Sequence, residues 1–187
     1  MVIAIDLDDT LLDLATPLEQ VWAFTGGGPR DMLRCDWGNG ACYAASLAYL
    51  ARSSGWAAIN AHRGAERVLE WVAMAGHEVY YVSERPQDAY DATAAGLRRE
   101  DLLDFGELWI CGDTQRKHSA VLELMPDVLI DDDPAAAVLA MSRGIRTIVY
   151  AQPWNECLCG IDALAVAIQW MRDRNSVADL LGVTRRS

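Results

Sequence analysis

The chain has no apolar run close to the length of about 20 residues that a membrane-spanning helix needs. Its first apolar stretch stops at Asp6, too early for the hydrophobic region of a secretory signal peptide. Positive charge is scarce, because 16 Lys and Arg stand against 27 Asp and Glu, for a formal charge of −11. Such a surface repels a polyanion. We therefore expect a cytoplasmic protein that binds neither a membrane nor a long nucleic acid.

Cysteine is also sparse, with five residues in a chain of 187. The number is odd, and the chain is long enough to bury a core without covalent links. The close pair Cys157 and Cys159 has no second pair at the spacing of a zinc site. Disulfides and structural zinc are therefore not expected. The sequence contains neither internal repeats nor low-complexity tracts, and its length predicts one domain with a small insertion.

Apolar runs of strand length alternate with helical patterns along the chain. Strands are expected at 2–5, 77–82, 108–111, 127–130 and 146–150. Helices are expected at 16–24, 41–52, 64–75, 87–99, 117–124, 134–143, 162–172 and 177–181. This alternation predicts an α/β fold with a doubly wound, mostly parallel sheet. The stretch from 14 to 62 reads as a helical insertion after the first strand.

The first expected strand leads into Asp6–Thr10, a D-x-D-x-T pattern. Ligands bind at the carboxyl ends of the strands in an open α/β sheet, and residues two apart on a strand share a face. Asp6 and Asp8 can therefore converge, unless the turn that begins there swings Asp8 aside. Close carboxylates repel one another unless a cation is present. The alternative is a helix cap formed by Asp9 or Thr10.

Polar residues also follow the second and fourth expected strands. Ser83 ends the second, Asp131, Asp132 and Asp133 end the fourth, and Lys117 lies at the start of a helix between them. Taken singly, a serine before a proline is typical of a turn, a lysine of a solvated helix, and Asp133 of a helix cap. Taken together and in this order, at the carboxyl ends of strands in one sheet, they instead indicate a single polar site.

These residues resemble the four motifs of the haloacid dehalogenase superfamily of phosphohydrolases. The match consists of Asp6–Thr10, Ser83, Lys117 and Asp131–Asp132, in this order and over nearly the whole chain. A narrower resemblance connects the chain with the cytosolic 5'(3')-deoxyribonucleotidases and their bacterial and phage relatives. The segments that carry it are 55–65, 76–80, 127–132 and 152–155.

The resemblance implies a phosphatase that uses Mg²⁺. Asp6 would be the nucleophile and would form an aspartyl-phosphate. Asp8 would protonate the departing alcohol and later take a proton from water. The metal ion would be held by Asp6, by the main-chain carbonyl of Asp8, and by Asp131 or Asp132.

The resemblance also implies a phosphate-binding group. Ser83, Lys117 and the backbone N–H groups next to Ser83, that of Glu84 among them, would hold the transferring oxygens and balance their charge. Arg116 competes with Lys117, since the two residues are adjacent and only one of them can point into the site.

The insertion stands where this superfamily carries a cap domain, so the expected division is a core of 1–13 and 63–187 and a helical cap of 14–62. The cap is rich in aromatic residues, of which most are expected to fill its own core and one or two could stack on a base. Trp22 and Phe24 are two apart and cannot both face the core of one helix. The candidates for substrate contact are Trp22, Phe24, Trp37 and Arg85.

The predicted reaction is hydrolysis of (deoxy)ribonucleoside monophosphates, with a small phosphate monoester as partner. A polynucleotide 3'-phosphatase on the same core is the alternative; the Ser83-x-Arg85 pattern favours it, and the net charge opposes it. A phosphate-binding regulatory protein without turnover is a further alternative, which the complete set of catalytic residue types opposes. The sequence leaves open whether the chain forms a homodimer.

Overall fold

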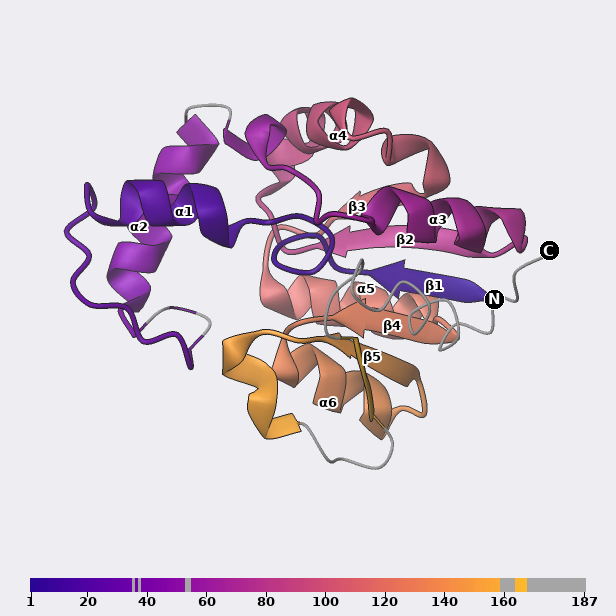
Figure 1. Ribbon diagram of the computed structural model, residues 1–187. Coiled ribbons are helices and arrows are strands. Elements are labelled where there is room, and N and C mark those ends of the chain that lie inside the picture. The colour runs from indigo at the N-terminus through magenta and orange to yellow at the C-terminus, as the bar shows by residue number, and fades with distance from the viewer. Residues whose placement is uncertain (35, 37, 53–54, 159–163, 168–187) are drawn as a thin grey trace.

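The computed structural model describes residues 1–34, 36, 38–52, 55–158 and 164–167. Within them, six parallel strands form one sheet in the order β3-β2-β1-β4-β5-β6 (Figure 1). The strands are β1 (Val2–Ile5), β2 (Glu78–Ser83), β3 (Glu107–Ile110), β4 (Val128–Asp131), β5 (Arg146–Tyr150) and β6 (Leu164–Ala167). The helices are α1 (Ala15–Trp22), α2 (Gly40–Arg52), α3 (Ala65–Met74), α4 (Tyr90–Arg99), α5 (Thr114–Leu124) and α6 (Pro134–Ser142). The predicted α/β fold with a doubly wound sheet is confirmed.

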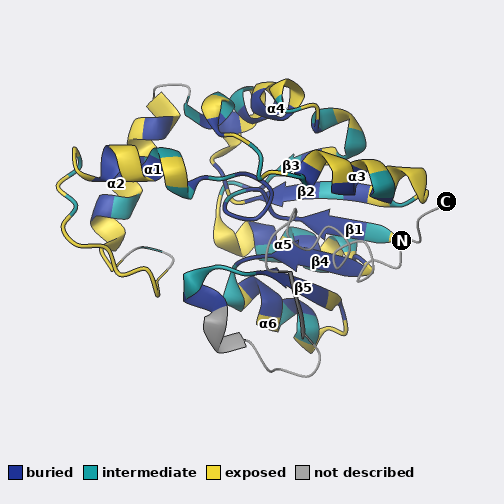
Figure 2. Ribbon diagram, viewed as in Figure 1, coloured by how far each residue is buried: buried dark blue, intermediate teal, exposed yellow. Residues whose placement is uncertain are grey.

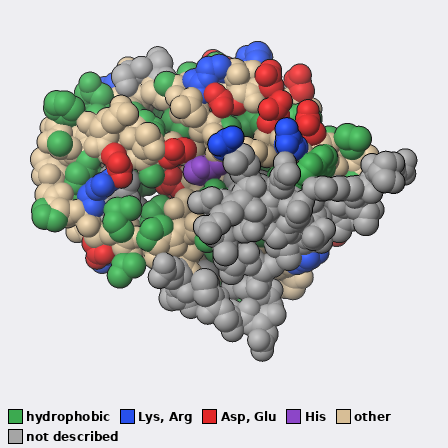
Figure 3. Space-filling view, in the orientation of Figure 1, with side chains coloured by type: hydrophobic (Ala, Val, Ile, Leu, Met, Phe, Trp, Pro, Cys, Tyr) green, Lys and Arg blue, Asp and Glu red, His purple; other side chains and the backbone are tan. Residues whose placement is uncertain are grey.

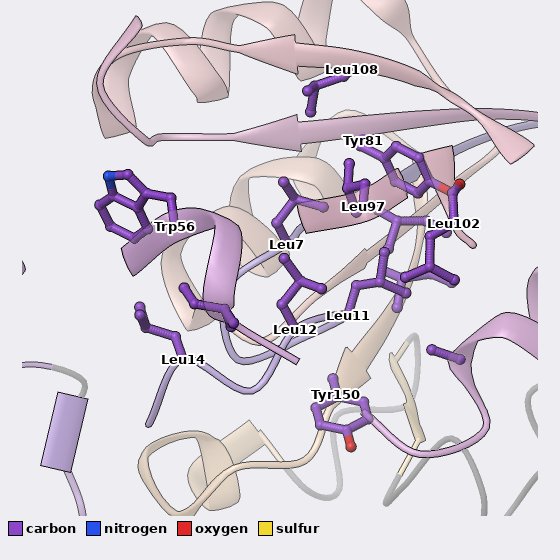
Figure 4. Packing of buried hydrophobic residues seen from close by; sticks show 14 of the residues in the cluster. Leu7, Leu11, Leu12, Leu14, Trp56, Tyr81, Leu97, Leu102, Leu108 and Tyr150 are labelled. Atoms are coloured by element: carbon purple, nitrogen blue, oxygen red, sulfur yellow. The ribbon is translucent and has the colours of Figure 1, made fainter. Parts of the chain in front are cut away.

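Helices cover both faces of the sheet because successive strand residues point to opposite sides and both sides are apolar. Ile3 and Ile5 belong to the core cluster that α3 and α4 close, which Figure 4 shows from close by. Ala4 belongs to a second cluster, on the side of α5 and α6. The strands β1, β2, β4 and β5 are accordingly mostly buried, whereas the outer faces of the helices are exposed (Figure 2). Complete burial of one side chain such as Ile5 contributes about 1.5–3 kcal/mol.

The helical insertion lies beyond the carboxyl ends of the strands, where α1 and α2 pack against each other (Figure 1). The two connections between insertion and sheet run side by side. Asp13 donates its N–H to the carbonyl of Asn60, and His62 donates to the carbonyl of Leu11, both at 2.9 Å. The expected boundaries of the cap, at 14 and 62, remain a prediction.

The expected helix at 162–172 is wrong for residues 164–167, which form β6 in parallel register with Thr147–Tyr150. Leucine and alanine favour a helix when only local preferences act. Pairing with the otherwise open edge of β5 satisfies backbone N–H and C=O groups and outweighs that preference. The rest of that expected helix, and the one at 177–181, lie outside the described residues.

The remaining expected elements are present, with small shifts at their ends. The shift at α5 matters for the site. This helix begins at Thr114 rather than at Lys117, because Asp113 caps it by accepting the N–H of Arg116. Among the described residues, no helix combines the length and the apolarity that crossing a membrane would require.

Candidate active site

Three adjacent strands of the sheet lead into polar residues at their carboxyl ends. Asp6 follows β1, Ser83 ends β2 and Asp131 ends β4. Asp6 is 4% exposed and the other two are fully buried. The sheet continues up to the site, since the N–H of Asp6 donates to the carbonyl of Ile130 at 2.9 Å. Because the strands are parallel, their carboxyl ends meet here, as the sequence predicts.

Lys117 lies in the first turn of α5, and its ammonium group is buried between two of these carboxylates. Its Nζ is 2.7 Å from Oδ1 of Asp6 and 2.9 Å from Oδ2 of Asp131. The neighbouring Arg116 has 67% of its side chain exposed and pairs with Asp113. Of the two adjacent cations, Lys117 is therefore the one that points into the site.

Asp6, Asp131 and Asp132 each offer a carboxylate oxygen, and these oxygens lie within 4.8 Å of one another. Oδ2 of Asp131 is buried and accepts no hydrogen bond from the described residues, although it forms an ion pair with Lys117. Hard divalent cations prefer oxygen ligands, carboxylates above all. The three residues form a buried cluster that fits a metal ion, and we call them the acidic cluster.

Asp132 is held in place from two distant segments. Its Oδ1 accepts the hydroxyl hydrogen of Thr10 at 2.8 Å, and its Oδ2 accepts the indole N–H of Trp154 at 3.0 Å. The side-chain amide of Asn155 donates to the main-chain carbonyls of Asp132 and Tyr150, both at 2.8 Å. Sequence reasoning gave Trp154 and Asn155 no role in the site. The signal that could have revealed one is their position directly after β5, at the same edge of the sheet.

Burial dominates the acid–base behaviour of the acidic cluster. Burial raises the pKa of Asp6 well above its usual value, while Lys117 opposes this and Asp131 adds to it. Burial and the charge of Asp131 likewise raise the pKa of Asp132. Burial alone would lower the pKa of Lys117, but the charges of Asp131 and Asp6 raise it above its usual range. A cation bound at the cluster would favour the ionised carboxylates.

The side chain of Asp8 lies outside the acidic cluster, because the turn after β1 directs it towards Arg85. Nη2 of Arg85 is 2.6 Å from Oδ1 of Asp8, and Nε is 2.8 Å from Oδ2. Arg85 was expected to contact substrate, yet it is 2% exposed and its third nitrogen, Nη1, donates to Thr93 at 3.0 Å. Its guanidinium group also lies over the ring of Trp56, 4.6 Å from the ring centroid. The carboxylate of Asp8 explains why a charged side chain is buried here.

Ser83 and Glu84 differ sharply in exposure. Oγ of Ser83 accepts the backbone N–H of Arg85 at 3.2 Å, and among the described residues its own hydroxyl donates to no acceptor. The exposed side chain of Glu84 instead accepts the hydroxyl of Thr114. Of Glu84, therefore, only the backbone N–H is suited to the phosphate-binding role expected for it.

The aromatic residues of the insertion also differ from one another. Trp22 is 5% exposed and donates its indole N–H to the carbonyl of Gly28 at 2.9 Å. Its ring lies so close to Gly27 that a Cβ there would be 2.2 Å from Nε1, so Gly27 must stay a glycine. Trp22, expected as a candidate for stacking on substrate, is thus part of the packing of the insertion. Trp37 lies outside the described residues.

Phe24 is 86% exposed, which agrees with the expectation that Trp22 and Phe24 face different sides. Figure 3 shows hydrophobic side chains on the surface at the side of the insertion, on the left of the view. Among the described residues of the insertion, the large exposed hydrophobic ones are Phe24, Met32, Leu33 and Tyr49.

No family model and no curated protein matches the chain. Solved structures do. A haloacid dehalogenase-like hydrolase from Streptococcus pneumoniae superposes with a TM-score of 0.68 at 14% identity, over 96% of this chain and 97% of the other. A haloacid dehalogenase family hydrolase from Deinococcus radiodurans, with bound phosphate and sodium, gives 0.67 at 16% identity, over 98% and 97%.

A third solved structure, from Rhodobacter sphaeroides, holds xylulose-1,5-bisphosphate and carries an Asp-to-Asn substitution. It gives a TM-score of 0.57 at 13% identity, over 90% of this chain and 94% of the other. The narrower resemblance to deoxyribonucleotidases remains a prediction. What the superpositions and the strand order do establish is that this chain has the Rossmann-like α/β fold of haloacid dehalogenase-like hydrolases.

Proposed function

We propose that the protein is a Mg²⁺-dependent phosphomonoesterase that works through an aspartyl-phosphate on Asp6. The observation that carries the proposal is the contact of Lys117 with both Asp6 and Asp131 within the acidic cluster. Burying several charges together costs several kcal/mol per ion unless the geometry compensates for it. Such arrangements with strongly shifted pKa values are concentrated at catalytic sites.

Asp6, Asp131 and Asp132 would hold Mg²⁺, with the main-chain carbonyl of Asp8 as a further ligand. When bound, Mg²⁺ neutralises charge on the carboxylates and on the phosphate dianion, which allows the two to approach each other. Asp132 already has its orientation, because Thr10 and Trp154 hold both of its carboxylate oxygens. This preorganisation is typical of metal sites that do not rearrange on binding.

Asp6 and Asp8 divide the chemistry between them. In the first step an oxygen of Asp6 bonds to phosphorus, the bond from phosphorus to the ester oxygen breaks, and Asp8 gives that oxygen a proton. In the second step water attacks the phosphorus, Asp8 takes a proton from the water, and the bond from Asp6 to phosphorus breaks. Phosphate leaves and both carboxyl groups return to their starting states. Lys117 balances the charge on the transferring oxygens, and Ser83 holds them through its hydroxyl group.

The substrate we propose is a (deoxy)ribonucleoside monophosphate. Its support is the resemblance to deoxyribonucleotidases and the exposed ring of Phe24 on the insertion, which could stack on a base. The similar solved structures with bound phosphate and with xylulose-1,5-bisphosphate support a small phosphate compound as the substrate. The 3'-phosphatase alternative loses support, because the Arg85 that favoured it is engaged with Asp8.

The test is the release of phosphate from three kinds of substrate, each with Mg²⁺ and then with EDTA. These are para-nitrophenyl phosphate, a panel of nucleoside monophosphates, and a 3'-phosphorylated oligonucleotide. We expect turnover of the first two that EDTA abolishes, with the highest kcat/KM on a nucleotide. Turnover confined to the oligonucleotide would favour the alternative. Phosphate binding without turnover of any substrate would show a binding protein instead.

A further inference from the structure

Arg85 connects parts of the chain that lie far apart in the sequence. It binds Asp8 after β1 and Thr93 in α4, and it covers the ring of Trp56 in the 3-10 helix Gly55–Ala58, which follows α2. Its side chain is 1% exposed, so water does not compete for these contacts. All three guanidinium nitrogens donate, and the face of the group is covered as well. Arg85 is therefore fixed in position.

A paired contact of this kind determines orientation as well as distance. Two parallel N–H···O bonds between a planar guanidinium group and a carboxylate restrict rotation of the carboxylate, which a single bond does not. The Asp8 side chain nevertheless stays 18% exposed, so Arg85 fixes it without enclosing it. A group that exchanges a proton with substrate must lie within hydrogen-bond distance of the reacting oxygen, and small displacements slow the reaction.

We propose that Arg85 is a positioning residue, which fixes the carboxylate of Asp8 for proton transfer, and that Trp56 stabilises Arg85 in turn. The inference rests on the proposed function, in which Asp8 is the acid and base. Arg85 touches no reacting atom and acts through Asp8 alone. Because Trp56 belongs to the segment that returns from the insertion, the same contacts tie the acid to the position of that segment.

The dependence of the rate on the leaving group tests this role. Para-nitrophenolate leaves without help from an acid, whereas the alkoxide of an alkyl phosphate needs a proton. We would compare para-nitrophenyl phosphate with ethyl phosphate in the wild type and in the variants Arg85→Lys, Arg85→Gln, Asp8→Asn and the double variant Asp8→Asn/Arg85→Lys. Arg85→Lys keeps the charge but loses the paired geometry, and it is the variant to use if Arg85→Gln does not fold.

The expected result is a selective loss. Each Arg85 variant should lose at least about 10-fold more kcat/KM on ethyl phosphate than on the aryl ester, within the range of a misplaced acid, because kcat/KM reports the step in which the alcohol leaves and not the later hydrolysis of the aspartyl-phosphate. Asp8→Asn should show the same selectivity more strongly. Adding Arg85→Lys to Asp8→Asn should cost little more, since residues that act as one unit are not additive.

Arg99 provides the matched control. It donates to the carbonyls of Ala57 and Ile59, so it holds the same returning segment but does not contact Asp8. Arg99→Lys should change both substrates equally. Trp56→Leu should reproduce the selective loss, and Trp56→Phe should do so less, because the indole nitrogen has no hydrogen-bond partner among the described residues.

Equal losses of kcat/KM on both esters in folded Arg85 variants would overturn the positioning role and leave the proposed function intact. A faster reaction of ethyl phosphate in Arg85→Lys would also overturn it, because Arg85 would then be restraining Asp8. A wild-type protein that hydrolyses neither these esters nor any nucleoside monophosphate would refute the proposed function, and the positioning role with it.

Discussion

Trp154 and Asp132 are joined by a buried hydrogen bond, in which the indole N–H donates to Oδ2 of the carboxylate at 3.0 Å. Thr10 occupies the other oxygen, so Asp132 has little freedom to rotate. Donors behind a metal ligand typically change metal affinity by about 10–100-fold when they are removed. Trp154 is therefore expected to contribute to metal binding without touching the metal.

The substitution Trp154→Phe keeps an aromatic ring and removes this donor. Mg²⁺ binding is expected to raise Tm, and in this variant the Mg²⁺ concentration that gives half of the maximal increase should be about 10-fold higher than in the wild type. Trp109→Phe is the control, because Trp109 donates to the carboxylate of Glu107 at 2.8 Å, outside the acidic cluster. A Mg²⁺ titration in which the two variants behave alike would contradict the role of Trp154.

The nucleophile is tested by Asp6→Asn, which keeps the shape of the side chain and removes its negative charge. Activity on any phosphate ester should fall by several orders of magnitude, the scale seen when the residue that makes the covalent bond is lost. The control is Asp133→Asn, which lies outside the acidic cluster and at an N-cap position where asparagine is also favoured. More than about a tenth of the wild-type kcat in folded Asp6→Asn would exclude Asp6, judged against that scale.

The two adjacent cations of α5 should behave in opposite ways. Lys117→Met leaves Asp6 and Asp131 without their common partner, and removal of one member of a buried ion pair costs about 3–5 kcal/mol. Activity should be lost, and Mg²⁺ should restore part of the lost stability because it replaces the missing charge. Arg116→Met, at a side chain 67% exposed, should change neither property measurably. Urea unfolding with and without Mg²⁺, together with phosphate release, checks both statements.

The parts of this site that the sequence predicts are those that follow from strand ends. An apolar run followed by Asp6 or by Asp131 reveals both the strand and the edge at which it stops. The choice between Lys117 and Arg116 could not be made in this way, because it depends on Asp113 capping α5 earlier than the hydrophobic pattern suggests. One residue more or less at a helix start rotates every later side chain by about 100°.

Contacts between segments that lie far apart in the chain could not be predicted from the sequence either. Arg85 and Asp8 are 77 positions apart, and Trp154 and Asp132 are 22 apart, without any local pattern that pairs them. The Ser83-x-Arg85 pattern favours a contact of Arg85 with substrate, and it does not reveal the contact with Asp8. The sequence likewise predicts a helix at 164–167, where a strand forms. Pairing with β5 determines the conformation of these residues, and their own preferences do not.

Stability at different pH tests the buried Asp9. It has a left-handed backbone, with φ 59°, and burial raises its pKa from 3.8 to about 8. Between these values the folded chain holds a proton that the unfolded chain has lost, so the stability due to this group falls as pH rises towards 8. Asp9→Asn removes the titration and tolerates the same backbone.

In EDTA, Asp9→Asn should therefore match the wild type near pH 4 and exceed its unfolding free energy near pH 8, by on the order of a few kcal/mol. Urea unfolding at the two pH values measures this. Asp101→Asn is the control, since Asp101 has φ 57° but is exposed. A gain of the same size at both pH values would show that the pKa of Asp9 is not the cause.

The nucleotide proposal is tested at Phe24, which is 86% exposed and can be truncated without opening a core. Phe24→Ala should raise the KM for a nucleoside monophosphate in proportion to about 1–3 kcal/mol of lost stacking, and should leave para-nitrophenyl phosphate nearly unchanged. Leu33→Ala, at another exposed residue of the insertion, is the control. If both substrates weaken equally, or neither does, Phe24 is not a base platform.

The central place of β1 in the sheet has a consequence during synthesis on the ribosome. Ile3 pairs with Val79 on one side and with Val128 on the other, so both neighbours of this strand are made much later. Pairing over such separations is slow, and an apolar strand with two open edges invites association with other nascent chains. Asp6 is thus made 111 residues before Lys117, and it meets Lys117 and Asp131 only after these later segments have been translated. Protection of β1 until these strands are made, by a chaperone or by rapid folding of α3 against β2, therefore bears directly on the yield of active protein.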